Sequence, residues 1–218
     1  MEATHSARLD PASRELLLHV AAAAIESGLA SNSRLPPDAR DLPADLLRKQ
    51  ASFVTLTIDG RLRGCCGTLE PHRLLATDAW HNAQASAFRD PRFGQLQFED
   101  WCHADLEVAV LSPLEPMPSQ SVPALLGELR PGVDGLVIAW RGARATFLPK
   151  VWQSIPDPLE FLRQLKIKAG WRDDFWAPGI EAWRYETQTM AMQRPCTRAR
   201  AGGCRANPGA SQPRTLPP

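Results

Sequence analysis

The chain has 218 residues, of which 44% are hydrophobic and 22% charged, a composition typical of globular proteins. No apolar run approaches the roughly 20 residues of a membrane-spanning helix. Residues 1–10 carry no hydrophobic signal segment, so we expect no membrane association and a cytoplasmic location. Five cysteines, an odd number without Cys-x-x-Cys spacing, argue against a disulfide framework and against a structural zinc site.

The net charge of +1 is unevenly distributed along the chain. Residues 191–218 hold five of the 25 basic residues and no acidic one, so residues 1–190 hold 20 basic and 24 acidic residues. The resulting net charge of −4 opposes binding of this part to a phosphate backbone. The Arg, Pro, Gly and Ser content of the remainder predicts a disordered basic tail over 191–218, after a folded domain over 10–190.

The first predicted element is a helix over residues 11–28. Asp10 is a good N-cap, Pro11 suits the first helical position, and Gly28 favours termination. Apolar residues recur at helical spacing between these signals.

A β-hairpin is predicted next. Residues 53–58 have strand character, Asp59-Gly60 is the strongest short hairpin signal, and residues 61–69 form the return strand. Gly64 and Gly67 flank two adjacent cysteines, so we expect this strand to bend or bulge there.

The rest of the chain mixes helices and strands. Four prolines between 113 and 123 predict a break in regular structure. We expect a helix over 71–88, a strand over 106–110, a hairpin joining 135–140 to 145–148, a helix from Asp157-Pro158 to Gly170, and a strand over 183–187. This order predicts an α+β fold with a largely antiparallel sheet and packed helices.

The return strand carries the most specific motif, Leu62-Arg63-Gly64-Cys65-Cys66-Gly67-Thr68. It closely resembles the signature of the AMMECR family, which reads Leu-Arg-Gly-Cys-Ile/Val-Gly. Further matches follow in the family's order, and they include Asn82-Ala83, Asp90-Pro91-Arg92-Phe93, Leu106-Glu107-Val108, Asp134-Gly135-Leu136, Phe147-Leu148-Pro149 and Lys168-Ala169-Gly170. Two positions depart from the pattern, because Cys66 replaces Ile or Val and Lys150 replaces Gln.

The resemblance implies a two-lobed AMMECR-type domain over residues 10–190, without a particular reaction or cofactor. Prokaryotic members look like component A of the three-part AmmeMemoRadiSam set, which implies Memo-like and radical-SAM proteins as partners. Part of the fold has been likened to nucleotide- and nucleic-acid-binding folds. That likeness implies a small-molecule, nucleotide or RNA ligand.

Cys65 is the leading candidate for catalysis. Its flanking glycines let backbone amides approach an anion, and Arg63 beside the sulfur would favour a thiolate. Glu107 would act as a base or orienting acceptor if it faces Cys65 across the sheet. The alternatives are a packing role for Cys65 in a bent strand and a solvated strand face for Glu107.

Candidate ligand-binding residues surround the motif or follow in the later matches: Gly64, Gly67, Thr68, Asp90, Arg92 and Lys168. Asp90 and Arg92 would hold a phosphate or pair with each other, and an Asp in such a turn commonly bonds nearby amides. Lys168 sits at a predicted helix C-terminus, where the helix dipole alone favours a cation.

Two classes of function remain open. One is a thiol-dependent enzyme, or a component of a modification system, with its site around Cys65. No histidine occupies a motif position, and this argues against a hydrolase that uses a Cys–His pair. The other class is a non-catalytic module that binds nucleotide, RNA or peptide, or a protein scaffold.

Overall fold

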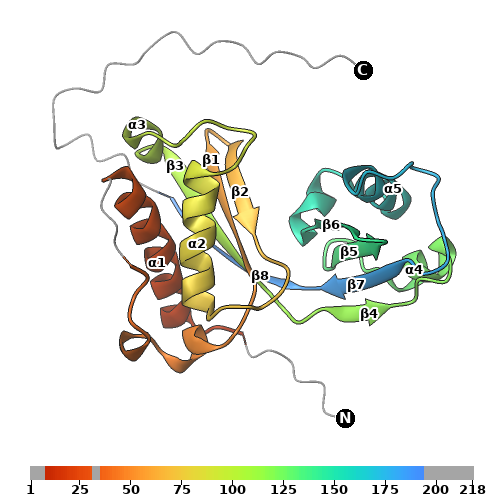
Figure 1. Cartoon of the computed structure of the whole chain (residues 1–218), viewed down its shortest axis with the longest axis horizontal. Coiled ribbons are helices and arrows are strands. Elements are labelled where there is room, and N and C mark those ends of the chain that lie inside the picture. Colours follow the sequence, from red (N-terminus) through yellow and green to blue (C-terminus); the bar gives the residue numbers. More distant parts are fainter. Residues whose placement is uncertain (1–7, 31–34, 194–218) are drawn as a thin grey trace, which may run out of the picture.

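The computed structural model describes residues 8–30 and 35–193 and forms two lobes, each built on a four-stranded sheet (Figure 1). The strand order is β2-β1-β3-β8 in the first lobe and β4-β7-β5-β6 in the second, and neighbouring strands are antiparallel. The predicted α+β class with antiparallel sheets is confirmed. No helix in the described residues is long and apolar enough to cross a membrane.

The first lobe combines three helices with four strands. Its elements are α1 (Pro11–Leu29), two short 3-10 turns η1 (Ala39–Asp41) and η2 (Ala44–Leu47), β1 (Ser52–Ile58), β2 (Arg61–Gly67), α2 (Leu75–Phe88), α3 (Phe98–Trp101), β3 (Ala104–Leu111) and β8 (Thr187–Met192). As predicted, Asp10 caps α1 by accepting a 2.8 Å hydrogen bond from the amide of Ser13.

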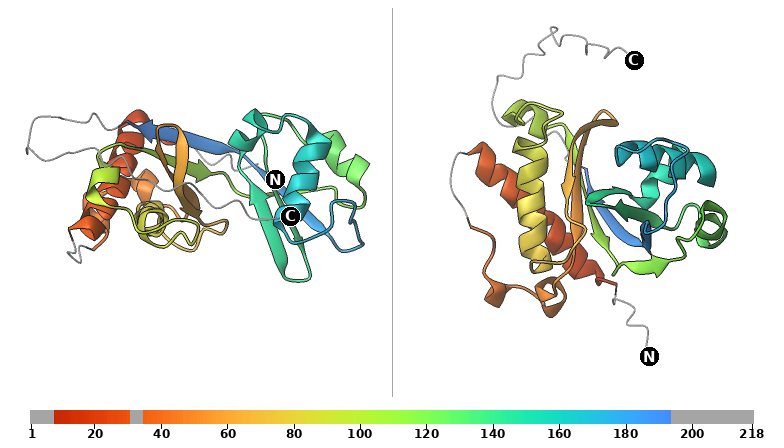
Figure 2. Two further views of the ribbon diagram at one scale, coloured as in Figure 1. Left: turned by 90° about the horizontal axis from the view of Figure 1, so that it is seen from above. Right: turned by 45° about the vertical axis from the view of Figure 1, so that its right-hand side comes forward.

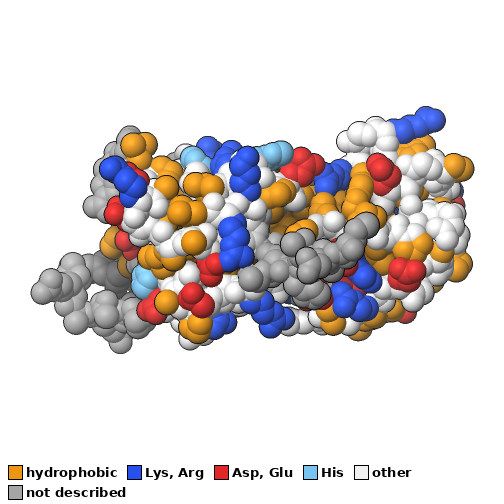
Figure 3. All heavy atoms as spheres, turned by 90° about the horizontal axis from the view of Figure 1, so that it is seen from below, with side chains coloured by type: hydrophobic (Ala, Val, Ile, Leu, Met, Phe, Trp, Pro, Cys, Tyr) orange, Lys and Arg blue, Asp and Glu red, His pale blue; other side chains and the backbone are white. Residues whose placement is uncertain are grey.

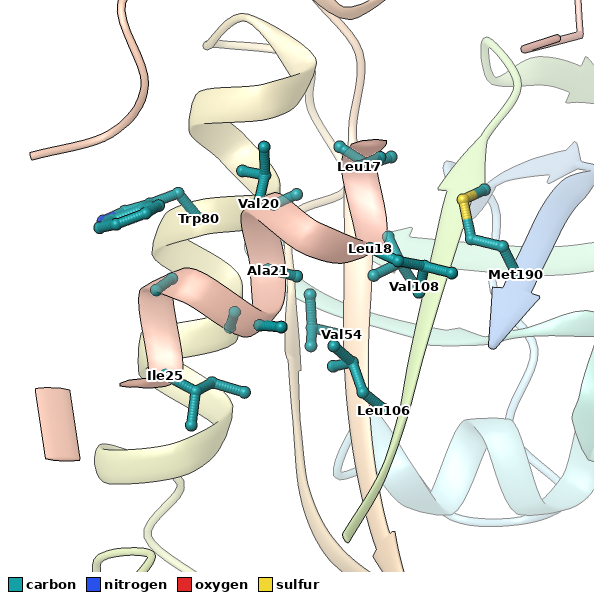
Figure 4. Close-up of a cluster of buried hydrophobic side chains, with 14 of the residues drawn as sticks. Leu17, Leu18, Val20, Ala21, Ile25, Val54, Trp80, Leu106, Val108 and Met190 are labelled. Carbon is teal, nitrogen blue, oxygen red and sulfur yellow. The ribbon is translucent and has the colours of Figure 1, made fainter. Parts of the chain in front are cut away.

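Both long helices pack on one face of the first sheet. Figure 4 shows Leu18 and Ala21 of α1 close to alternate residues of the strands, among them Val54, Leu106 and Val108. The side of α2 that packs in this core carries small residues that are 0–1% exposed: Ala76, Ala79, Ala83 and Ala87. Small side chains let the α2 backbone approach the sheet closely, and this approach constrains β2.

The second lobe is formed by β4 (Glu115–Met117), α4 (Val122–Glu128), β5 (Gly135–Trp140), β6 (Ala143–Phe147), the 3-10 turn η3 (Pro149–Gln153), α5 (Pro158–Lys168) and β7 (Glu181–Tyr185). The predicted break over the proline-rich stretch is confirmed in part, because residues 112–114 and 118–121 form no helix or strand, whereas β4 and the start of α4 lie within the stretch. Ser121 caps α4 by accepting from the amide of Ala124, and Pro123 lies in the first turn of the helix, where proline is tolerated.

Two chain segments run from one lobe to the other, β3 into β4 and β7 into β8 (Figure 1). The predicted last strand, 183–187, covers the junction of β7 and β8, and β8 runs two residues past the predicted domain end at 190. Residues 194–218 of the predicted tail lie outside the described residues.

The second lobe lies beside the face of the first sheet that α1 and α2 leave uncovered (Figure 2). Where the lobes meet, a small apolar cluster includes Leu111 of β3, Val137 of β5 and Tyr185 of β7. This arrangement turns one face of β1, β2 and β3 toward residues of the second lobe.

Candidate functional site

Three polar side chains form a row across the first sheet. β1 lies between β2 and β3, and the strand register places Cys65 on one side of Thr55 and Glu107 on the other. Their neighbours Val54 and Leu56 enter the core under the helices, so the row points to the opposite face, toward the second lobe. The sequence left open which face Glu107 occupies, and the structure places it on the face of Cys65, with Thr55 between them.

The second lobe adds Lys150 of η3 to this row. The Lys150 ammonium donates to Glu107 Oε1 at 2.7 Å and to Thr55 Oγ1 at 3.2 Å. The Thr55 hydroxyl in turn donates to Cys65 Sγ at 3.5 Å. A hydrogen-bond chain thus leads from the ion pair to the sulfur, and a donor at the sulfur stabilises negative charge there.

Lys168, the last residue of α5, brings a second ammonium group to the same junction. It donates to the backbone carbonyl of Thr146 at 2.9 Å and lies 5.1 Å from the ring centre of Phe147. The pKa of Lys168 is lowered, chiefly by desolvation of the amine; a charged Cys65 raises it and Arg92 lowers it. The Lys168 side chain is exposed, and its contacts are with Thr146 and Phe147 of β6.

Asp90 fixes the backbone of Cys65 from a buried position. Its side chain is only 4% exposed and accepts a 2.9 Å hydrogen bond from the Cys65 amide. It also accepts from the Arg92 amide at 3.1 Å and from the guanidinium at 2.7 and 3.0 Å, so the two side chains pair. These bonds lower the pKa of Asp90 to about 2, and the bonds from the Arg92 guanidinium make the largest contribution.

Arg63 does not join this row. It occupies the bulge in β2, where the register shifts between Leu56 and Thr57. Its guanidinium contacts Asp100 of α3 at 3.3 Å and lies 6.0 Å from the ring of Phe93. The predicted role of Arg63 beside the sulfur has no supporting contact, and the guanidinium that contacts Cys65 is that of Arg92, which donates to the Cys65 carbonyl at 3.4 Å.

The candidates Gly64, Gly67 and Thr68 have contacts that position β2. A Cβ atom on Gly64 would lie 2.1 Å from the carbonyl oxygen of Ser86 in α2, and one on Gly67 would lie 2.2 Å from the Phe53 ring. The Thr68 hydroxyl donates to the buried Asp78 at 2.8 Å. None of these contacts involves the row itself.

Cys66 differs from Cys65 in its surroundings. Its amide donates to the Ser86 hydroxyl on α2 at 2.8 Å, and it pairs with the core residue Val54 rather than with Thr55. Burial raises the pKa of the Cys66 thiol, and the nearby negative charges of Asp90 and Cys65 raise it further. Strand alternation therefore separates the two thiols.

Two residues of the site were not predicted from the sequence. Thr55 is polar among apolar strand neighbours, and strand alternation relative to Cys65 was a signal that could have identified it. Lys150 stood out only as a departure from the family pattern. Within residues 8–30 and 35–193, no group of three or more His, Cys, Asp or Glu side chains could hold a metal ion.

Comparisons with known proteins span both lobes. A model of the AMMECR1 family matches residues 18–190. A protein of Thermofilum pendens is 34% identical over 204 residues, which cover 86% of this chain and 93% of that protein. A protein of Methanothermobacter thermautotrophicus is 37% identical over 180 residues, which cover 79% of this chain and 90% of that protein. The crystal structure of the uncharacterized protein PH0010 from Pyrococcus horikoshii matches with a TM-score of 0.79 and 28% identity, covering 86% of this chain and 95% of that one.

Proposed function

The chain belongs to the AMMECR1 family, and for this chain we propose a thiol-dependent enzyme, or the thiol-bearing component of a modification system, that acts through Cys65. One observation carries the proposal. The Cys65 thiol accepts a hydrogen bond from Thr55 on the sheet face toward which the second lobe directs Lys150. A packing cysteine in the core under α1 and α2 would need none of these polar neighbours.

The proposed chemistry assigns one task to each group. In this proposal Lys168 accepts the thiol proton, because desolvation lowers the pKa of its amine. The sulfur then bonds to an electrophilic carbon of the substrate, while that carbon's leaving group departs with its bonding electron pair. The Thr55 hydroxyl orients the sulfur, and Lys150 with Glu107 holds that hydroxyl in place.

The proposal includes the partners that the family resemblance implies, Memo-like and radical-SAM proteins. The alternative is a non-catalytic module that uses the same cations to hold a nucleotide, RNA or peptide. RNA is the least favoured of these ligands. The face in Figure 3 mixes acidic and basic side chains on both lobes, whereas a phosphate backbone requires a basic surface.

The proposal is tested by the reaction of the folded protein with iodoacetamide at pH 7, followed by peptide mass spectrometry. We expect Cys65 to be alkylated without unfolding and roughly ten times faster than Cys66, whose raised pKa leaves less thiolate. A Cys66→Val variant, which restores the usual family residue, should leave the rate at Cys65 unchanged. Alkylation of Cys65 only after unfolding in urea would show a packing cysteine and exclude thiol catalysis.

A further inference from the structure

The hairpin end of the first lobe holds an open hollow that the proposed thiol chemistry does not use. Ile58 pairs with Ala104 at the start of β3, so this hollow lies at the end of the sheet where α3 precedes β3 (Figure 1). Its volume is about 500 Å³, within the range of small-molecule sites. The lining comes from the two strands and their turn: Ile58, Asp59, Arg61, Leu62 and Arg63.

The bulge in β2 gives Arg63 an incomplete set of partners. Bulges re-aim side chains, and Arg63 has no paired residue in β1. Its side chain is only 16% exposed, and among the described residues its buried Nη1 has no hydrogen-bond partner. The ion pair with Asp100 uses Nη2 and is long at 3.3 Å. Because a buried donor without an acceptor is costly, an added acceptor would be stabilised at Arg63.

Arg61 brings a second guanidinium to the same hollow. Its side chain is exposed, and within residues 8–30 and 35–193 no acidic side chain lies within ion-pair distance of it. Leu62, which is 43% exposed, and the half-buried Ile58 add apolar surface. Asp59 is the acidic residue of the lining, so two cations face one carboxylate. Guanidinium groups beside apolar surface are complementary to an organic anion.

From this arrangement we propose that Arg61 and Arg63 bind the phosphate or carboxylate group of a small organic anion, whose apolar part lies on Leu62. The site is separate from the row of Cys65, Thr55 and Lys150. In the described part of the chain, no side-chain hydrogen bond or ion pair joins its lining to that row. The inference therefore goes beyond the proposed function and gives Arg63 a role that does not involve the thiol.

Titration of the ¹⁵N-labelled full chain with phenyl phosphate, followed through backbone amide chemical shifts, tests the site. We expect saturable shifts at residues 58–63. The dissociation constant should be roughly tenfold lower than that of inorganic phosphate, because the phenyl ring covers apolar surface of Leu62. Phenylacetate presents a carboxylate instead, so the tighter of the two aromatic probes identifies the preferred anionic group.

Three variants test the assigned residues. Arg61→Gln should raise the dissociation constant of phenyl phosphate roughly fivefold, the effect of one ion pair in water, and Arg63→Gln at least as much. Because the Arg61 side chain is exposed, its replacement leaves the fold intact. Asp59→Asn should lower the dissociation constant, since it removes the carboxylate that opposes the anion. Arg141→Gln, an exposed arginine in the turn of the second hairpin, is the matched control and should have no effect.

The outcomes also distinguish this site from the thiol site. Shifts that do not saturate, shifts outside the hairpin, or equal affinities of the wild-type protein and Arg61→Gln would overturn the hairpin site. Cys65→Ser should bind phenyl phosphate like the wild-type protein. Loss of binding in Cys65→Ser would show that the anion lies at the thiol and would also overturn the hairpin site.

Discussion

Asp90 shows how a single buried carboxylate can organise this site. It accepts from the Cys65 amide on β2 and from three nitrogens of Arg92, and thereby fixes the strand and the cation together. The sequence left open whether Asp90 and Arg92 pair with each other or hold a phosphate. It did not predict the bond to Cys65, which is 25 residues away in the chain.

Replacing Asp90 by Asn should lower the free energy of unfolding at pH 7 by about 2 kcal/mol, because a buried charged acceptor is lost. The pKa of Asp90 is depressed from 3.8 to about 2, so its contribution is complete above the unfolded value and disappears as the pH falls toward 2. Urea denaturation between pH 7 and pH 2 measures this difference.

The control for this prediction is Asp59→Asn in the exposed hairpin turn. Asn tolerates the positive φ of 51° at that position as readily as Asp does. The Asp59→Asn variant should therefore have a free energy of unfolding close to that of the wild-type protein. A pH-independent loss at Asp90→Asn would contradict a role for the carboxylate charge.

The contact between β2 and α2 explains the glycine that precedes Cys65. Gly64 is buried, and its missing side chain lets the Ser86 carbonyl approach the strand. This contact gives Gly64 a structural function that does not depend on any ligand.

Gly64→Ala should destabilise the protein by about 3 kcal/mol, because the new methyl group would overlap backbone atoms of α2 that cannot move independently. Gly94→Ala is the matched control, since nothing lies within 4 Å of its added Cβ. Chemical denaturation compares the two variants. Equal stabilities would show that α2 does not constrain β2 in this way.

The sequence could predict the helices and turns whose ends are determined by residues adjacent in the chain. Asp10 and Pro11 start α1, and Arg141-Gly142 turns the second hairpin with φ values of 48° and 86°. The start of α4 within residues 113–123 was not predicted, because proline was interpreted only as a breaker. Pro123 is compatible with the first turn of α4, and the cap at Ser121 decides the outcome there.

At the scale of the whole molecule, the site depends on how the second lobe docks against the first sheet. The Lys150–Thr55 contact joins residues 95 positions apart, and no local pattern in the sequence reports it. Glu70 and Arg144 form a second ion pair between the lobes at 2.5 Å. Cys65 and Glu107 could be predicted from motif and alternation, whereas Lys150 and Thr55 needed the arrangement of the lobes.

The most direct test of this arrangement uses a short cross-linker with one thiol-reactive and one amine-reactive end. The chain has four lysines, at positions 49, 150, 166 and 168, so the partners of Cys65 can be assigned by peptide mass spectrometry. The structure predicts a link from Cys65 to Lys150, in a Cys66→Val background that removes the neighbouring thiol. If the reagent modifies Cys65 but links it only to Lys49, or to no lysine, this result would contradict a site shared by the two lobes.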